Sequence, residues 1–406
     1  MFEPLKDKKI VDLSQVLAGP FATYQLGLMG AEVIKIENPN GGDWTRIGDW
    51  VPDLADKNMG MAYVVQNSNK KSVVINLKTP EGVATLKRLV AEADVFVENF
   101  KPGVARRLGL GFEDLREVNP KVVYCSVSAF GQDGEFSNRP SYDHIVQGMC
   151  GIMLTTGEPD SGPTKVGSPY VDYATGMNAA MAILAGLHEV NRTGQAVHLD
   201  VAMLDTALML MVALMSRTLS TDWIPAPSGN EAWSASPSSG AFDTSDGTLM
   251  LAANNAPQFE RMCAAMGRQD ILEDDRWSSL QGRKENAGAL RDTLVETFLT
   301  RPASEWEDVL SAASVPAGRL RSIDEILAED HTKTRGLTSQ IEIEEYHRPI
   351  HIPAMTFKVN GQNHPNKKPP SHLGEDTDAV LQAAGFDKDE LKALRDAGTI
   401  PSEIAE

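Results

Sequence analysis

The sequence predicts an α/β fold, in which a large domain with a Rossmann-like parallel sheet is joined to a smaller α+β domain. Over residues 1–203, short β-branched and apolar runs alternate with helical segments, which is the pattern of parallel α/β sheets. The 406 residues, 42% hydrophobic and 23% charged, suffice for two domains with ordinary cores. Pro, Ser, Gly and Asn gather in residues 221–239, which indicates a loop where the composition changes.

The first half of the chain carries most of the predicted sheet. Strands are expected at residues 9–13, 32–37, 71–77, 94–100, 121–126 and 196–201. Helices are expected at residues 19–29, 79–93, 104–108, 112–118 and 203–219. Pro20 suits the first turn of the first of these helices, and Thr79-Pro80-Glu81 supplies a cap, a first-position proline and a first-turn acid to the second.

The second half predicts the smaller domain and the end of the larger one. A hairpin is expected at residues 240–254, because Asp246-Gly247 is a turn signal between two apolar runs. Helices are expected at residues 257–266, 283–300, 303–313, 376–384 and 387–397, and strands at residues 341–345 and 355–358. The large domain is therefore assigned to residues 1–203 and 350–406, the small domain to 225–329, and linkers to 204–224 and 330–349.

Charge and cysteine content restrict the class of protein. A net charge of −18 argues against a nucleic-acid or anionic-membrane binder. Cys125, Cys150 and Cys263 form no CxxC motif, which favours a reducing compartment without disulfides or zinc. The first residues do not resemble a signal peptide, and the longest apolar runs, 177–187 and 207–215, are too short to cross a bilayer. We expect a cytoplasmic protein with no metal.

The most informative stretch places one acidic residue between a turn and a helix. Gly167-Ser168-Pro169 precedes Asp172, and a run of small and apolar residues follows. We expect Asp172 at or just before a helix N-terminus, where free N–H groups and the helix dipole hold a carboxylate ionised. An N-cap and a catalytic acid both remain open for Asp172. Asp143 has the same two readings, as a cap or as a second acid of the site.

Basic residues cluster in one segment of this acidic chain, as an anionic ligand requires. They are Lys70, Lys71, Lys78, Lys87, Arg88, Lys101, Arg106 and Arg107. Lys87 and Arg88 fall in the middle of a predicted helix and are assigned to a solvated face. Lys78 follows a predicted strand, at the edge where open α/β sheets bind their ligands. Lys78 and Arg107 are therefore the favoured cationic contacts.

The stretch from Thr155 to Gly176 resembles the signature of the class III CoA-transferases, the family of formyl-CoA transferase and the carnitine CoA-transferases. The resemblance covers nearly the whole chain and is strongest over residues 10–205. It implies that Asp172 is the nucleophile, that Asp143 is an active-site acid and that the chain forms an interlocked homodimer. It also implies CoA as a substrate, acyl-CoA and small carboxylic acids as partners, and no permanently bound cofactor.

The same resemblance assigns the CoA contacts and shows where this chain departs from the family. The contacts are Leu17, Ala18, Ile75, Lys78, Asn99, Phe100, Arg107 and Tyr142. Asn38 and Pro140 stand where the family has an Arg and a Lys, and Leu17 stands where formyl-CoA transferase has a Gln. A Ser-rich stretch, 234–240, takes the place of the Gly-rich loop of oxalate-using members. These departures disfavour oxalate and formate, and succinate is the expected donor acid.

The expected reaction is CoA transfer through an aspartyl anhydride and an aspartyl-CoA thioester, with oxyanion donors near Gly176 or in residues 236–240. A 2-methylacyl-CoA racemase is the first alternative, but that branch has a His where this chain has Tyr142. An NAD-dependent oxidoreductase is disfavoured because the turn at residues 17–22 lacks GxGxxG. A non-catalytic CoA-binding protein is the last alternative, and it predicts that Asp172 is dispensable.

Overall fold

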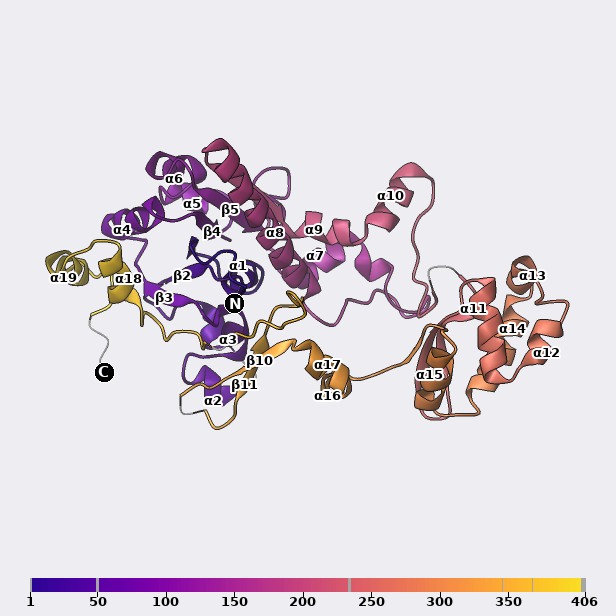
Figure 1. Cartoon of the computed structure of the whole chain (residues 1–406). Helices are drawn as coiled ribbons and strands as arrows, with labels where there is room; N and C mark the ends of the chain where they lie inside the picture. Colours follow the sequence, from indigo (N-terminus) through magenta and orange to yellow (C-terminus); the bar gives the residue numbers. More distant parts are fainter. Residues whose placement is uncertain (1, 49–50, 233–234, 345, 367, 403–406) are drawn as a thin grey trace. The chain divides into compact units, whose positions relative to one another are not determined.

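The computed structural model of the chain describes residues 2–48, 51–232, 235–344, 346–366 and 368–402. The chain divides into two compact units (Figure 1). The first contains residues 1–152, 165–224 and 333–406, and the second contains residues 153–164 and 225–332. Residues 204–224 and 333–349, assigned to linkers from the sequence, thus belong to the first unit.

The first unit is built on a six-stranded parallel sheet in the order β3-β2-β1-β4-β5-β6. The strands are β1 (Lys9–Asp12), β2 (Glu32–Glu37), β3 (Lys71–Val74), β4 (Val95–Glu98), β5 (Val123–Ser128) and β6 (Val197–Ala202). This confirms the predicted α/β class with a Rossmann-like sheet. The strand order reverses between β1 and β4, and ligands of such sheets bind outside the strand ends at this switch point.

Helices cover both faces of the sheet, because alternate residues of each strand point to opposite sides. Ile10, Val33 and Val95 face α1 (Ala18–Leu28) and α8 (Tyr170–Thr193). Val11 and Phe96 belong to the core on the other face, which α4, α6, α18 and α19 cover. These helices span Pro80–Ala91, Phe112–Val118, Thr377–Ala383 and Lys388–Asp396.

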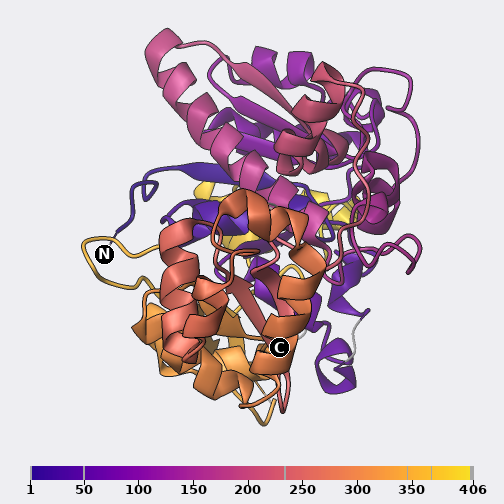
Figure 2. The same ribbon diagram turned by 90° about the vertical axis from the view of Figure 1, so that its right-hand side faces the viewer.

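Helix α8, the long magenta helix of Figure 2, packs closely against α1. Gly176 makes the approach possible, because a Cβ at this position would lie 2.7 Å from the carbonyl oxygen of Ala18. The rings of Phe21 and Tyr173 meet edge to face, with centroids 5.0 Å apart. The start of α8 is therefore fixed against the start of α1.

Shorter elements complete the first unit. They are α2 (Pro52–Ala55), α3 (Met61–Asn67), α5 (Val104–Arg107), α7 (Asp143–Cys150), β10 (Thr338–Ile341), β11 (Ile350–Pro353) and the 3-10 turn Trp44–Arg46. Helix α17 (Asp330–Arg335) and the 3-10 turn Ile152–Leu154 lie across the boundaries between the units. The predicted strand at residues 355–358 is wrong. The strand is β11, in which Ile350 and Ile352 are buried and His351 is exposed, and it pairs with β10. The other predicted strand, at residues 341–345, is also misplaced, because β10 ends at Ile341; residue 345 lies outside the described residues.

The single helix predicted at residues 203–219 is also wrong. It is broken at Met211 into α9 (Met203–Leu210) and α10 (Val212–Ser220), which meet at 82°. The backbone leaves the helical region at Met211 because α9 packs on α7 and α8, whereas α10 buries none of its residues. In the described ranges no single helix is long and apolar enough to span a membrane, although this bent pair passes that test together.

The second unit is a small α+β body with its own apolar core. The predicted hairpin is confirmed as β7 (Ser239–Asp243) and β8 (Thr248–Ala252), and β9 (Ala317–Arg319) adds a third antiparallel strand. The helices are α11 (Ala256–Met266), α12 (Gln269–Glu273), α13 (Leu280–Glu285), α14 (Ala287–Phe298), α15 (Ala303–Ala312) and α16 (Ile323–Ala328). The helix predicted at residues 283–300 is divided at Asn286.

Candidate active site

Asp172 lies in the first turn of α8, as its third residue, and its side chain is partly buried. The N-cap position is occupied by Pro169, so the reading of Asp172 as an N-cap is wrong. The helix begins here because Pro169 has no backbone N–H, so the helical hydrogen bonds cannot extend further toward the N-terminus. The small residues after Asp172 let α8 approach α1. Gly176 lies one turn later inside α8, where its own N–H belongs to the helix ladder, so an oxyanion donor in this region would be another group near Gly176.

Asp143, and not Asp172, accepts the free N–H groups at the start of α8. Its Oδ2 accepts hydrogen bonds from the backbone N–H of Val171 at 2.9 Å and of Asp172 at 3.1 Å. Asp143 is the first residue of α7, and only 8% of it is exposed. Asp143 therefore acts as a cap, but for α8 and not for its own helix, α7. These hydrogen bonds place Asp143 beside Asp172.

This arrangement reverses the expected electrostatics of Asp172. Burial and the negative charge of Asp143 raise the pKa of the Asp172 carboxyl to about 7. The prediction that the helix N-terminus keeps Asp172 ionised is wrong, because the N–H groups that would do so are bonded to Asp143. Within the described residues, the Asp172 carboxylate has no cation and no hydrogen-bond donor.

Gln147 fixes Asp143, and sequence reasoning missed it. Its Nε2 donates to Asp143 Oδ1 at 2.6 Å, and its Oε1 accepts from the N–H of Val166 at 2.9 Å. Gln147 is fully buried, and it ties α7 to the segment that leads into α8. The i,i+4 spacing of Asp143 and Gln147 was the available signal, but the helix that makes this spacing meaningful was not predicted.

Two of the predicted CoA contacts lie at the start of α1. Leu17 is the N-cap residue of this helix and Ala18 is its first residue, and Leu17 offers no side-chain cap. Asn99 follows β4 across the switch point, where its side chain accepts from Gln15 N–H at 2.9 Å and donates to Gln15 O at 2.7 Å. Asn99 therefore shapes the loop before Leu17 with its own side chain.

At Phe100 and Ile75, the backbone N–H groups rather than the side chains make the polar contacts at the edge of the sheet. Phe100 donates its N–H to Glu98 Oε2 at 2.8 Å, and its ring packs on the core. Burial raises the pKa of the Glu98 carboxyl. Ile75 follows β3 with a buried side chain and an N–H bonded to Glu37 O at 3.0 Å. These residues set the edge of the sheet.

The remaining predicted contacts are exposed. Lys78 and Arg107 follow β3 and β4, and neither has an ion-pair partner in the described part of the chain. Tyr142 occupies the N-cap position of α7 without a side-chain cap, its side chain is 63% exposed, and its ring stacks on His144. The structure thus brings Asp143 to Asp172 and Ala18 to α8, and it leaves Lys78, Arg107 and Tyr142 open to solvent. Residues 236–240 belong to the second unit, and Ser234 lies outside the described residues.

The chain is similar in sequence to known CoA-transferases. The sequence matches CoA-transferase family III over residues 5–377. It is 39% identical to the succinate–glutarate CoA-transferase of Agrobacterium fabrum over 352 residues, which is 84% of this chain and 86% of that protein. It is 33% identical to the human succinyl-CoA:glutarate CoA-transferase, covering 98% of this chain and 90% of that protein.

The fold is also similar to that of solved structures. A CaiB/BaiF family protein from Brucella suis superposes with a TM-score of 0.83 at 30% identity, covering 95% of this chain and 100% of that chain. The family match and the relatives lead to one assignment. The chain belongs to CoA-transferase family III and is an enzyme that transfers CoA between an acyl-CoA thioester and a carboxylic acid.

Proposed function

We propose that CoA transfer proceeds through covalent intermediates on Asp172. The Asp172 carboxylate attacks the carbonyl carbon of the donor thioester, and CoA thiolate leaves, which gives a mixed anhydride. The thiolate attacks the Asp172 carbonyl of the anhydride, releases the donor acid and leaves an aspartyl-CoA thioester. The acceptor carboxylate attacks this thioester and expels CoA thiolate. The thiolate then attacks the acceptor carbonyl, which gives the new acyl-CoA and free Asp172.

The observation that carries this proposal is the Asp172 carboxylate itself, partly buried and without a partner among the described residues. A carboxylate with a pKa of about 7 is more basic, and hence more nucleophilic once ionised, than an ordinary one. Asp143 supplies part of this effect and holds the start of α8 in place. Positioning provides the remaining rate, because carboxylates are weak nucleophiles.

The CoA moiety is proposed to lie along the carboxyl edge of the sheet. Leu17, Ala18, Ile75, Asn99 and Phe100 contribute the edge itself. Lys78 and Arg107 are exposed cations for the phosphates, which Arg binds by paired donors. Tyr142 is exposed one residue before Asp143, where it contacts the thioester arm. CoA is a substrate in this scheme and no resident cofactor is required.

Succinyl-CoA is the proposed donor, and a five-carbon dicarboxylate such as glutarate is the proposed acceptor. The two relatives named above act on succinate and glutarate. A 2-methylacyl-CoA racemase receives no support from them. Incubation with succinyl-CoA and a panel of mono- and dicarboxylic acids, read by mass spectrometry, tests the assignment. Glutarate is expected to give glutaryl-CoA faster than acetate or oxalate gives its thioester, and a preference for a monocarboxylate would contradict it.

The enzyme is proposed to be a homodimer in the cytoplasm. Large apolar side chains are exposed on three adjoining helices of the first unit. They are Ile145 and Met149 on α7, Met177, Met181 and Leu184 on α8, and Met209 and Leu210 on α9. An exposed patch of this kind favours a protein interface, and the interlocked arrangement follows from the family resemblance. The three free cysteines agree with a reducing compartment.

Replacing Met181 with Glu is expected to prevent assembly of the dimer, so that the purified chain is a monomer. Met181 is 64% exposed on α8, and a buried charge at an apolar interface is strongly unfavourable. Light scattering after size-exclusion chromatography gives the mass directly. Leu280→Glu is the matched control, because Leu280 is 48% exposed in the second unit and lies on none of these helices. An unchanged mass for Met181→Glu would place the interface elsewhere.

A further inference from the structure

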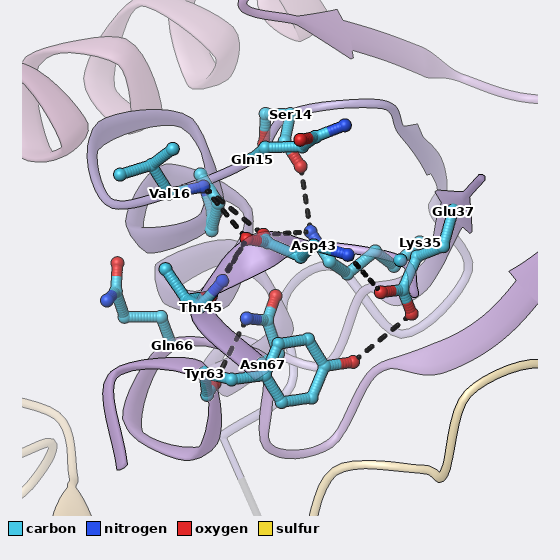
Figure 3. A network of polar contacts seen from close by, with 12 residues as sticks. Ser14, Gln15, Val16, Lys35, Glu37, Asp43, Thr45, Tyr63, Gln66 and Asn67 are labelled. Atoms are coloured by element: carbon cyan, nitrogen blue, oxygen red, sulfur yellow. Dashed lines mark hydrogen bonds and ion pairs between the residues drawn. The ribbon is translucent and has the colours of Figure 1, made fainter. Parts of the chain in front are cut away.

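A network of buried side chains holds the loop that enters α1 (Figure 3). Asp12 accepts the N–H of Ser14 at 2.9 Å, and Lys35 donates to Ser14 O at 2.7 Å. Asn99 binds both polar groups of the Gln15 backbone. Asp43 accepts the N–H of Val16 at 3.2 Å. Five consecutive backbone groups are thus held by side chains from four different segments.

The network consists of three acids and three bases, each at most 4% exposed. They are Asp12, Lys35, Glu37, Asp43, Arg46 and Lys70. Asp43 Oδ2 lies 3.1 Å from Lys35 Nζ, and Lys70 Nζ lies 3.0 Å from Asp12 Oδ2. Buried ion pairs contribute little net stability, because desolvation offsets their attraction, although they can select one conformation over others.

The conformation selected here is a strained one. Val16 has a φ of 74°, a left-handed backbone that β-branched residues strongly disfavour. Its N–H points at the Asp43 carboxylate (Figure 3). Without the network, Val16 would be expected to relax into the β region and carry Leu17 and Ala18 with it. A strain of this kind persists only where the surroundings enforce it.

We propose that Asp43 and Lys35 are positioning residues, which hold the strained loop at Val16 so that Leu17 and Ala18 meet the CoA nucleotide. Neither residue contacts CoA in this proposal. Asp43 binds Val16 directly, and Lys35 joins Asp43 to Ser14. The inference rests on the proposed contact of Leu17 and Ala18 with CoA. This positioning role explains why the six buried charged residues lie next to the loop at Val16.

Asp43→Asn in the full-length enzyme tests the proposal. An amide cannot accept from Val16, Thr45 and Lys35 as the carboxylate does. The KM for succinyl-CoA is expected to rise at least about tenfold, with the KM for the acceptor acid unchanged and kcat lowered less than about threefold. Tyr63→Phe is the matched control, because Tyr63 is buried in the far half of the network and touches Glu37 and Arg46 only through its hydroxyl and ring.

Val16→Gly provides a test that does not depend on the Asp43 variant folding. Glycine adopts a positive φ without strain, so Val16→Gly is expected to raise the melting temperature. A lower melting temperature would overturn the strain argument. In the double variant Val16→Gly with Asp43→Asn, the KM for succinyl-CoA is expected to return toward the wild-type value. A merely structural role of Asp43 predicts no such rescue, and an unchanged KM in Asp43→Asn also overturns the proposal.

Leu17→Asp separates this inference from the proposed function. An acid at the N-cap of α1 would repel the CoA phosphates and raise the KM for succinyl-CoA. If Leu17→Asp leaves that KM unchanged, the proposed CoA contact fails, whatever the Asp43 variant does. If Leu17→Asp raises the KM and Asp43→Asn does not, the contact stands and the positioning role of Asp43 is overturned.

Discussion

Asp172→Asn is expected to lower kcat for CoA transfer by about 10³-fold or more, because an amide cannot form the acyl anhydride. The wild-type enzyme, quenched with hydroxylamine during turnover of succinyl-CoA, is expected to yield a hydroxamate on the peptide that carries Asp172. Peptide mass spectrometry detects this product. An unmodified Asp172 peptide in a wild-type enzyme that is turning over would contradict the covalent step.

The chain offers a close control for this variant. Asp205 is the third residue of α9, just as Asp172 is the third residue of α8. In both helices the side chain of the N-cap residue makes no capping hydrogen bond. Asp205→Asn is expected to retain activity within about threefold, because Asp205 is exposed and the like charge that acts on it is Asp200, not Asp143. Equal losses in the two variants would indicate a general effect of acids in a first helical turn.

The thermal stability of Asp172→Asn distinguishes lost chemistry from lost folding. The pKa of Asp172 is about 7 in the folded chain and near 3.8 when unfolded, so the folded state binds the proton more tightly. The favourable contribution is complete below pH 3.8 and is lost as the pH rises through about 7. At pH 8 the Asn variant avoids the buried charge and is expected to be more stable by about 1–2 kcal/mol, after allowance for solvent at this partly exposed group.

The fold was predictable because its signals are local. Alternating apolar runs located the six strands of the parallel sheet, and Asp246-Gly247 located the hairpin of the second unit. The errors occurred where distant packing decides the backbone. Nothing in residues 203–219 signals a break, which follows from how α9 packs on α7 and α8. The strand at Ile350–Pro353 was missed although its period-2 pattern was present.

The two acids of the candidate site could be chosen from the sequence, but their hydrogen bonds and the raised pKa of Asp172 could not. The turn before Asp172 marked the acid, and the resemblance marked Asp143. That Asp143 would accept the N–H groups of α8 could not be inferred, because the two residues meet only through tertiary packing. Asp43 and Lys35 carried no signal, since their role depends on a backbone angle at Val16 that sequence patterns do not encode.

A second large effect is expected in the pH dependence of kcat/KM, on its acid limb. Because the nucleophile must be ionised, kcat/KM is expected to fall about tenfold per pH unit below a pKa of about 7 in the free enzyme. Asp143→Asn removes the like charge and is expected to move this limb to lower pH. It also lowers kcat by about 10- to 100-fold, since one amide oxygen cannot accept from Gln147, Val171 and Asp172 together.

Gln147→Leu separates the charge of Asp143 from its position. The leucine side chain would fill a similar volume but would not donate to Asp143 Oδ1 or accept from Val166. A lower kcat is expected, as in Asp143→Asn, but the charge of Asp143 remains, so the acid limb is not expected to move to lower pH. If both variants shift the limb alike, the pKa of Asp172 is set by the packing of the α8 start. If only Asp143→Asn shifts it, the repulsion between the two carboxylates keeps Asp172 basic enough to attack a thioester.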